Sequence, residues 1–371
     1  MMNTNSPIKQ ELNTQPNVKV GISIGDVNGI GPEVIMKALS DTRLLVGCTP
    51  IIYASNKVFL FHEKALNAGD DLEGEFNYNS CNSIEDIQLN KINVVKIWDD
   101  EIPFDLGKAT IAGGKHAFES LEKATQDLAS GKIDVLVTAP INKDAMNKSG
   151  FKFPGHTEYL ADLAGEDEAL MLMVSSSLRV GLVTSHIPLK EVSETVTAEK
   201  VLAKLSAFND SLKKDFGIKR PKIAVLGLNP HAGENGKMGS EENESISPAI
   251  AKASNQGILT FGPFPADGFF GSDSRYQYDG VLAMYHDQGL AAFKALSFDE
   301  GVNFTAGLPI VRTSPDHGTA YDIVGQNKAS GDSMRNAIYL AIDVYRNHLM
   351  EKEINKNPLA ISEKKTWKED R

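Results

Sequence analysis

The fold of this chain is decided first by residues 18–33, which read VKVGISIGDVNGIGPE. Val18 to Ile24 is an apolar, β-rich run that stops at a loop of three glycines, and Pro32 stands where the first turn of a helix tolerates a missing N–H. The stretch therefore predicts strand, glycine loop and helix. Such a loop can bring backbone amides close to an anion. A plain tight turn has the same sequence, and the spacing is not the dinucleotide-binding fingerprint.

Short apolar runs and helical periodicity alternate along the rest of the chain. We expect further strands at residues 50–54, 92–97, 133–137, 169–174, 179–183, 222–228 and 281–284. We expect helices at residues 57–65, 114–130, 198–216 and 333–350. This order predicts an α/β fold with a largely parallel sheet. Because the chain has 371 residues and single cores stop growing near about 250–300, we expect two domains.

Three stretches lack a regular pattern. Residues 1–16 predict a disordered leader and 351–371 a charged tail, and the polar residues 67–90 predict a surface excursion. His116, near the start of an expected helix, is expected to be exposed or to cap it. Thr157 stands at another helix start, where it would cap the helix or help to hold an anion.

Composition restricts the class of protein. A formal net charge of −11 argues against a nucleic-acid surface, although a local cationic pocket for a small anion is compatible with it. No window approaches the roughly 18 apolar residues of a membrane span, and the polar start predicts no signal peptide. Cys48 and Cys81 make no disulfide framework. We therefore expect a cytoplasmic protein with no nucleic-acid or membrane partner.

Three histidines follow the ends of expected strands. His186, His231 and His286 each lie within a few residues of an apolar run. Carboxyl ends of parallel strands meet at one edge of a sheet, where α/β proteins keep their sites. Three imidazoles that leave one position open are typical of a catalytic metal site for Zn²⁺, Co²⁺ or a similar ion. A single histidine at such a place is more often a hydrogen-bonded structural group.

Other polar residues predict an anion site, a proton-transfer group and a cofactor loop. His156 stands at an expected helix N-terminus, while Lys294, Asn303 and Arg312 could neutralise a phosphate. Taken alone, such cations are usually solvated surface residues. Asp267, in the loop GPFPADG, is either a substrate-orienting or proton-transferring carboxylate or a turn residue. The glycine-marked residues 317–322 are a candidate cofactor loop.

Seven motifs in this order resemble the 4-hydroxythreonine-4-phosphate dehydrogenase family of vitamin B6 biosynthesis. They are GDVNGIGPE (25–33), TAPINK (138–143), FPGHTEYLA (153–161), TSHIPL (184–189), NPHAGE (229–234), MYHDQGL (284–290) and SPDHGTAYDIVG (314–325). Many members of the family have alanine and proline inside the first motif, where this chain has valine and asparagine. The resemblance covers about residues 19–350.

The resemblance assigns roles to individual residues. It implies metal ligands at His186, His231 and His286, substrate contacts at His156, Thr157, Lys294, Asn303 and Arg312, and cofactor contacts at His317, Gly318 and Asp322. Asp267 is the first candidate for the catalytic base and Lys294 the second. The implied cofactors are NAD or NADP and one divalent metal ion, Zn, Co or Mg.

The resemblance also implies an architecture. The fold would be similar to isocitrate and isopropylmalate dehydrogenases, with two α/β/α domains and a cleft between them rather than a Rossmann domain. Residues 17–150 and 310–350 would form the cofactor-side domain, and residues 151–309 the metal-side and dimer-side domain. The protein would be a homodimer whose active site is shared between the subunits.

The implied reaction oxidises 4-phosphooxy-L-threonine to a β-keto acid, which loses CO₂ to give 3-amino-2-oxopropyl phosphate. A sister dehydrogenase of 4-phospho-erythronate or threonate-type acids is the nearest alternative. Other sister enzymes act on aromatic cis-diol carboxylates, but such a diol would offer these cations no partner. A protein similar to acyl-phosphate transferases is the alternative from a different class, and a non-enzymatic metabolite-binding protein is a third.

Overall fold

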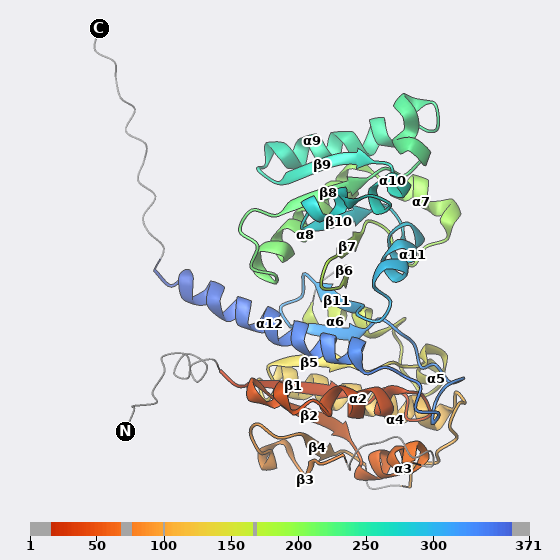
Figure 1. Cartoon of the computed structure of the whole chain (residues 1–371), viewed down its shortest axis with the longest axis vertical. Coiled ribbons are helices and arrows are strands. Elements are labelled where there is room, and N and C mark those ends of the chain that lie inside the picture. Colours follow the sequence, from red (N-terminus) through yellow and green to blue (C-terminus); the bar gives the residue numbers. More distant parts are fainter. Residues whose placement is uncertain (1–15, 68–75, 99–100, 166–168, 358–371) are drawn as a thin grey trace.

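The computed structural model describes residues 16–67, 76–98, 101–165 and 169–357, so most of the expected leader and tail lies outside the described residues. In that part of the chain, twelve strands form one sheet in the order β3-β4-β2-β1-β5-β12-β11-β6-β7-β10-β8-β9. The strands follow one another in this order along the long axis of the molecule, from β3 at the bottom of Figure 1 to β9 near its top.

The strands are β1 Val18–Ser23, β2 Cys48–Ala54, β3 Asn79–Cys81, β4 Asn93–Lys96, β5 Val135–Thr138, β6 Leu170–Val174, β7 Arg179–Leu182, β8 Lys222–Leu226, β9 Leu259–Phe264, β10 Gly280–Ala283, β11 Val302–Ala306 and β12 Arg312–Pro315. The α-helices are α2 Gly31–Leu39, α3 Asn56–Asn67, α4 Ile111–Ala129, α5 Lys143–Lys148, α6 His156–Ala164, α7 Val192–Thr195, α8 Ala198–Lys214, α9 Ser247–Asn255, α10 Ala266–Phe270, α11 His286–Ser297 and α12 Asp332–Ile354. Short 3₁₀ or π segments are η1 Thr42–Val46, η2 Ile84–Asp86, η3 Leu189–Glu191, η4 Pro230–Gly236, η5 Glu242–Ile246 and η6 Asp273–Gln277.

The α/β class and the largely parallel sheet are confirmed. The antiparallel pairs are β6 with β7, β6 with β11, and β11 with β12. Only residues 175–178 connect β6 to β7, and a link this short can join antiparallel strands but not parallel ones, which need a crossover. The predicted domain boundary at residue 310 falls between β11 and β12, and these two strands are paired in the same sheet. The division into domains at residues 150 and 310 stays a prediction.

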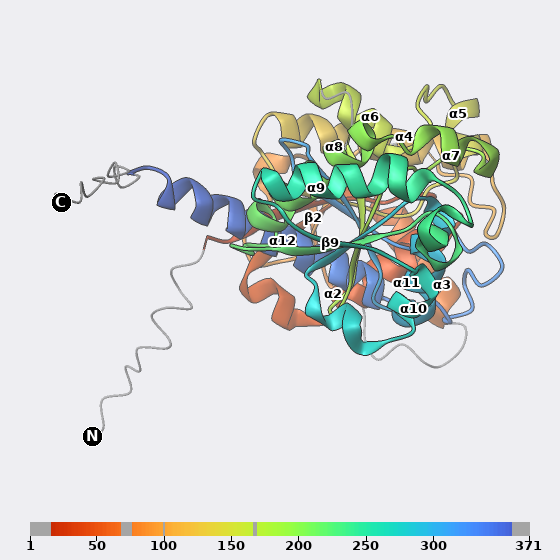
Figure 2. The same ribbon diagram turned by 90° about the horizontal axis from the view of Figure 1, so that it is seen from above.

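Helices cover both faces of the sheet. Figure 2 shows α4, α6 and α8 on one side and α2, α3, α10 and α11 on the other. Every residue of β2 is buried, as expected for a parallel strand covered on both faces. The stripe of α4 predicted from its spacing, which includes Ala117, Leu121 and Ala124, is buried as well. Among the helices of the described residues, none has the length and apolarity that crossing a membrane needs.

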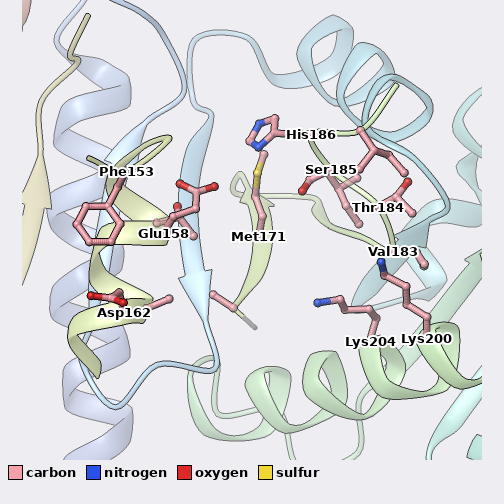
Figure 3. A pocket seen from close by; sticks show the side chains of 15 residues that line it. Phe153, Glu158, Asp162, Met171, Val183, Thr184, Ser185, His186, Lys200 and Lys204 are labelled. Atoms are coloured by element: carbon pink, nitrogen blue, oxygen red, sulfur yellow. The ribbon is translucent and has the colours of Figure 1, made fainter. Parts of the chain in front are cut away.

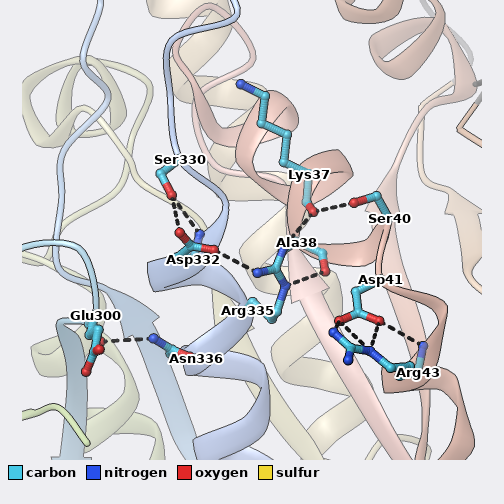
Figure 4. Close-up of polar contacts among 10 residues, drawn as sticks. All are labelled: Lys37, Ala38, Ser40, Asp41, Arg43, Glu300, Ser330, Asp332, Arg335 and Asn336. Atoms are coloured by element: carbon cyan, nitrogen blue, oxygen red, sulfur yellow. Dashed lines mark hydrogen bonds and ion pairs between the residues drawn. The ribbon is translucent and has the colours of Figure 1, made fainter. Parts of the chain in front are cut away.

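Helix α12 is fastened to the end of α2. Arg335 donates from Nη2 to the Lys37 carbonyl (3.1 Å) and from Nε to the Ala38 carbonyl (3.4 Å), as Figure 4 shows. Its Nη1 also bonds Asp332 Oδ1 at 2.7 Å. A cation at the last carbonyls of a helix satisfies acceptors that have no partner within the helix. The contact therefore joins the two ends of the chain across one face of the sheet.

Four local expectations differ from the structure. Part of the expected surface excursion forms the edge strand β3. Three polar residues show no alternation of apolar and polar side chains, so the sequence did not predict this strand. His116 is buried, with Nδ1 2.8 Å from the Ala112 carbonyl and its ring edge-on to Trp98. Helix α6 begins at His156 with Gly155 as its N-cap, so Thr157 does not cap it. The last helix also continues past residue 350 to Ile354.

Candidate active site

A cavity of about 290 Å³ lies where several predicted motifs meet. Its walls come from the segment after β5, the start of α6, strands β11 and β12, and the loop after β12. The five residues predicted to contact substrate all line it, namely His156, Thr157, Lys294, Asn303 and Arg312. Residues 156 and 312 are far apart in the chain, so this convergence is produced by the fold.

Arg312 places a buried positive charge in this cavity. Its side chain is 3% exposed. The guanidinium donates to Thr138 Oγ1 from Nη2 (2.6 Å) and Nε (3.1 Å), and to Thr305 Oγ1 from Nη1 (3.3 Å). Within the described residues no carboxylate forms an ion pair with it, and burial lowers its pKa to about 10. Arg312 therefore stays charged at neutral pH, and an anion in the cavity would neutralise it.

His156 adds a neutral hydrogen-bond donor. Burial, and then the charges of Arg312 and Lys143, hold the pKa of this histidine well below its usual value. Its Nδ1 accepts from Arg312 Nη2 at 3.2 Å, so the ring proton sits on Nε2. That buried Nε2 has no partner in the described structure. His156 therefore offers an unused N–H donor next to the guanidinium.

Two buried acceptors without a partner lie in the same cavity. Asn303 Oδ1 and His317 Nε2 accept no hydrogen bond from any described residue. His317 bonds the Gly318 carbonyl through Nδ1 (3.2 Å), which leaves Nε2 as an acceptor, and burial lowers its pKa. Buried polar atoms are almost always hydrogen-bonded. Open donors and open acceptors in one cavity suit a ligand that has both a negatively charged group and hydrogen-bond donors of its own.

Further residues of the cavity were not predicted. Asp316 forms an ion pair with Lys294 at 3.3 Å, and burial raises its pKa while Lys294 opposes that shift. Thr138, Lys143 and Glu158 also line the cavity. All four lie within or beside predicted motifs, such as TAPINK and SPDHGT. For Thr138 and Lys143, the sequence did contain a signal, because both follow an apolar run that predicts a strand.

His186 lines both this cavity and a larger cavity next to it. The neighbouring cavity, of about 550 Å³, shares Thr157, Glu158, Met171 and His186 with the first. Figure 3 shows the imidazole of His186 beyond Met171, with Glu158 on the α6 side and Lys200 on the α8 side. Burial and the charge of Lys143 lower the pKa of His186, which favours the neutral ring that binds metals.

The three predicted metal ligands are only partly brought together. The ring centroids of His186 and His286 are 5.8 Å apart. His286 donates from Nδ1 to Asp287 Oδ1 at 2.7 Å, which leaves its Nε2 lone pair available, a common arrangement of metal-binding histidines. His231 instead lines a third cavity, of about 490 Å³, together with Asp267. In the described part of one chain, no group of three metal-binding side chains is assembled.

The candidate cofactor loop packs on the glycine loop that follows β1. Ile30 N–H donates to the Thr319 carbonyl at 3.0 Å, and Tyr321 Oη donates to Asp26 Oδ2 at 2.5 Å. A Cβ on Gly29 would lie 2.8 Å from the Thr319 oxygen, so only glycine fits there. Burial raises the pKa of Asp26. His317 and Gly318 reach the Arg312 cavity, whereas Asp322 is exposed and does not line it.

Comparisons with known proteins agree on one family. The sequence profile of the family described as pyridoxal phosphate biosynthetic protein PdxA matches residues 46–341. A 4-hydroxythreonine-4-phosphate dehydrogenase of Bacteroides thetaiotaomicron is 50% identical over 92% of this chain and 93% of its own. A putative D-threonate 4-phosphate dehydrogenase of Oceanobacillus iheyensis is 40% identical over 88% of this chain and 97% of its own.

Solved structures agree with the sequence comparisons. The 4-hydroxythreonine-4-phosphate dehydrogenase of Klebsiella pneumoniae is similar with a TM-score of 0.75 and 33% identity, over 90% of this chain and 98% of that one. The fold and these relatives define the class, which is an α/β enzyme of the dehydrogenase type. The chain belongs to the pyridoxal phosphate biosynthetic protein PdxA family, which confirms the resemblance seen in its motifs.

Proposed function

We propose that this chain is a metal-dependent and NAD- or NADP-dependent dehydrogenase of 4-phosphooxy-L-threonine in pyridoxal 5′-phosphate biosynthesis. The product would be a β-keto acid that loses CO₂ to give 3-amino-2-oxopropyl phosphate. The observation that carries the proposal is the buried, unneutralised guanidinium of Arg312, beside the open N–H of His156. A close relative with 50% identity carries the name of this dehydrogenase. We further propose that the enzyme works in the cytoplasm.

The residues of the Arg312 cavity bind the substrate phosphate in this proposal. Arg312 supplies the charge, His156 Nε2 donates one hydrogen bond, and Lys294 adds a second cation from α11. Thr157 is available at the first turn of α6, where backbone amides favour an anion. Phosphate binding there is remote from the reacting carbon, and such energy orients the substrate for reaction. Asn303 accepts a hydrogen bond from the substrate through its open Oδ1.

The metal ligands are His186, His231 and His286, and the metal is Zn, Co or Mg. The paired rings of His186 and His286, with the Nδ1 of His286 turned to Asp287, fit two ligands of one ion. A divalent ion at this place supplies Lewis-acid polarisation of the substrate hydroxyl, which favours loss of its proton. We propose that His231 comes from the second copy of a homodimer, because its own chain keeps it in a separate cavity.

The cavity that His231 lines also contains the first candidate for the catalytic base. Asp267 lines it beside His231, so a partner subunit that delivers His231 would deliver Asp267 too. Lys294, the second candidate, is held by Asp316 in the phosphate cavity. NAD or NADP supplies the hydride acceptor. His317, Gly318 and Asp322 contact it in this proposal, and His317 and Gly318 reach the edge of the substrate cavity.

The test is NADH or NADPH formation with purified protein under Zn²⁺, Co²⁺ and Mg²⁺. We expect oxidation of 4-phosphooxy-L-threonine to exceed that of phospho-D-threonate and 4-phospho-erythronate, and to stop after treatment with EDTA. Preference for phospho-D-threonate would transfer the assignment to the second candidate, which the Oceanobacillus relative favours. An undiminished rate in EDTA would contradict the metal site. Absence of turnover with every acid would contradict the proposed function.

A further inference from the structure

The loop that carries His231 has an unusual backbone. Five successive residues, from His231 to Asn235, have positive φ angles between 42° and 77°, and four of them are not glycine. L-residues rarely adopt this left-handed region, and a run of them costs conformational energy. Such a conformation persists only where its surroundings enforce it. The surroundings of this loop should therefore contain a group that holds it.

That group is the carboxylate of Glu242. Its Oε1 accepts from the backbone N–H of Leu228 at 2.8 Å and of Asn229 at 2.7 Å. Its Oε2 accepts from Asn229 Nδ2 at 3.0 Å. All three donors belong to the two residues that lead from β8 into the loop. The carboxylate therefore fixes the point from which the chain turns toward His231.

The loop also wraps closely around this carboxylate. A Cβ on Gly233 would lie 2.5 Å from Glu242 Oε2, and a Cβ on Gly227 would lie 3.1 Å from Oε1. Gly233 has φ +77°, so a side chain there would be strained as well as obstructed. Glycine at both positions lets the backbone approach Glu242 from two sides. The packing ties the shape of the loop to one buried side chain.

Glu242 has no other evident role. Its residue is 3% exposed, and within the described residues it forms no ion pair. A buried carboxylate without a cation is costly unless hydrogen bonds compensate it. All of its hydrogen bonds go to the segment that leads to His231. It also begins the π-helical segment η5, a feature often found near functional sites.

We propose that Glu242 is a positioning residue that fixes the orientation of His231 for metal binding. The inference rests on the proposed function, in which His231 is a metal ligand. Replacing Glu242 by Gln keeps the size but turns one acceptor into an NH₂ donor that faces an N–H donor. Loss of a group that orients a metal ligand typically weakens metal affinity by about 10–100-fold. We expect a loss of that size in Glu242→Gln.

The experiment titrates the full-length protein with Co²⁺ and follows the visible absorption of the bound ion. Wild type and Glu244→Gln, a matched exposed glutamate of the same segment, should bind alike. Glu242→Gln should bind about 10–100-fold more weakly, with a shifted spectrum, while circular dichroism shows an intact fold. Wild-type affinity and spectrum in folded Glu242→Gln would overturn the proposal. If wild type and His231→Ala bind Co²⁺ equally, the metal role of His231 fails instead.

A second variant keeps the proposal testable if Glu242→Gln does not fold. Gly233→Ala places a methyl against Glu242 Oε2 and leaves the carboxylate in place. We expect it to weaken Co²⁺ binding and to alter the spectrum, because the loop must move away from the carboxylate. Gly236→Ala is its matched control, since that glycine also has a positive φ but its Cβ would meet only Asn243, at 3.4 Å. Equal Co²⁺ binding by both variants would overturn the proposal.

Discussion

The cavity around Arg312 and the region of the three histidines differ in how much of each is assembled within one chain. The cavity is assembled within one chain, with Arg312 and His156 buried in its wall and already hydrogen-bonded to each other. The histidines are divided, because His186 and His286 face each other while His231 lines another cavity. A phosphate site needs one set of converging donors, whereas the metal site needs three ligands around a point. In the proposed function, a single chain assembles the phosphate site and a second copy of the chain completes the metal centre.

The largest expected effect comes from the divided site. His231→Ala and His186→Ala should each lower kcat/KM by about a thousandfold or more, because the metal supplies several kcal/mol of transition-state stabilisation. Refolded together as mixed dimers, the two inactive variants should recover about a quarter of wild-type activity, since some dimers then hold one intact shared site. Turnover is measured by NADH formation.

The buried cavity provides the matched control. A mixture of Arg312→Met and His156→Ala should recover nothing, because both residues belong to the same chain's cavity and no intact site can form. Recovery of activity in this control mixture would contradict the assignment of the Arg312 cavity to one chain. Absence of recovery in the histidine mixture would contradict a metal site shared between two chains.

Arg312→Met should have the next largest effect. Removing a buried charge that binds an anion costs a few kcal/mol, so kcat/KM should fall about a hundredfold, mainly through KM. The free variant should melt no lower than wild type, because an unneutralised buried charge is lost. Phosphate should raise the melting temperature of wild type but not of the variant. Arg43→Met, at an exposed arginine paired with Asp41, should leave both properties unchanged. Phosphate stabilisation that survives in Arg312→Met would contradict the anion role.

The sequence predicted five residues that line the Arg312 cavity but missed several of their neighbours, and their binding of phosphate stays a prediction. Lys294, Asn303 and Arg312 were identifiable because the chain's motifs resemble a family with known contacts. Thr138 and Asp316 were missed because their importance arises only where β5 and β12 lie side by side. Strand β3 was missed because three polar edge residues show no alternation. The separation of His231 from its partners depends on loop conformation, which apolar runs do not encode.

The acid stability of the protein should report the buried histidine of the cavity. Burial keeps the pKa of folded His156 well below its unfolded value near 6.5, so below about pH 6.5 the unfolded chain binds a proton that the folded chain does not. Stability contributed by the neutral ring is therefore present above that pH and is lost as pH falls. In His156→Gln, the free energy of unfolding should fall less steeply as the pH is lowered, by up to about 1.4 kcal/mol per pH unit. Urea unfolding between about pH 7 and about pH 5 measures it. An unchanged slope would contradict the buried, neutral state of His156.

The smallest expected effect is at the rim of the Arg312 cavity. Asp316→Asn should raise KM a few-fold and leave kcat nearly unchanged, because the partly exposed Lys294 loses the partner that holds it at 3.3 Å. Asp144→Asn removes an exposed ion pair with Lys148 and should change neither value. Steady-state kinetics distinguish the two variants. A drop in kcat without a change in KM would mean that Asp316 acts in the chemical step.

The most direct test of the central claim compares 4-phosphooxy-L-threonine with unphosphorylated 4-hydroxy-L-threonine as substrates of the metal-loaded wild-type enzyme. The Arg312 cavity should make kcat/KM for the phosphorylated substrate at least about a thousandfold higher, because without a phosphate the buried guanidinium has no anionic partner, and the N–H of His156 no acceptor, among the described residues. Arg312→Met should remove most of that preference. Equal kcat/KM for the two compounds in wild type would contradict the account.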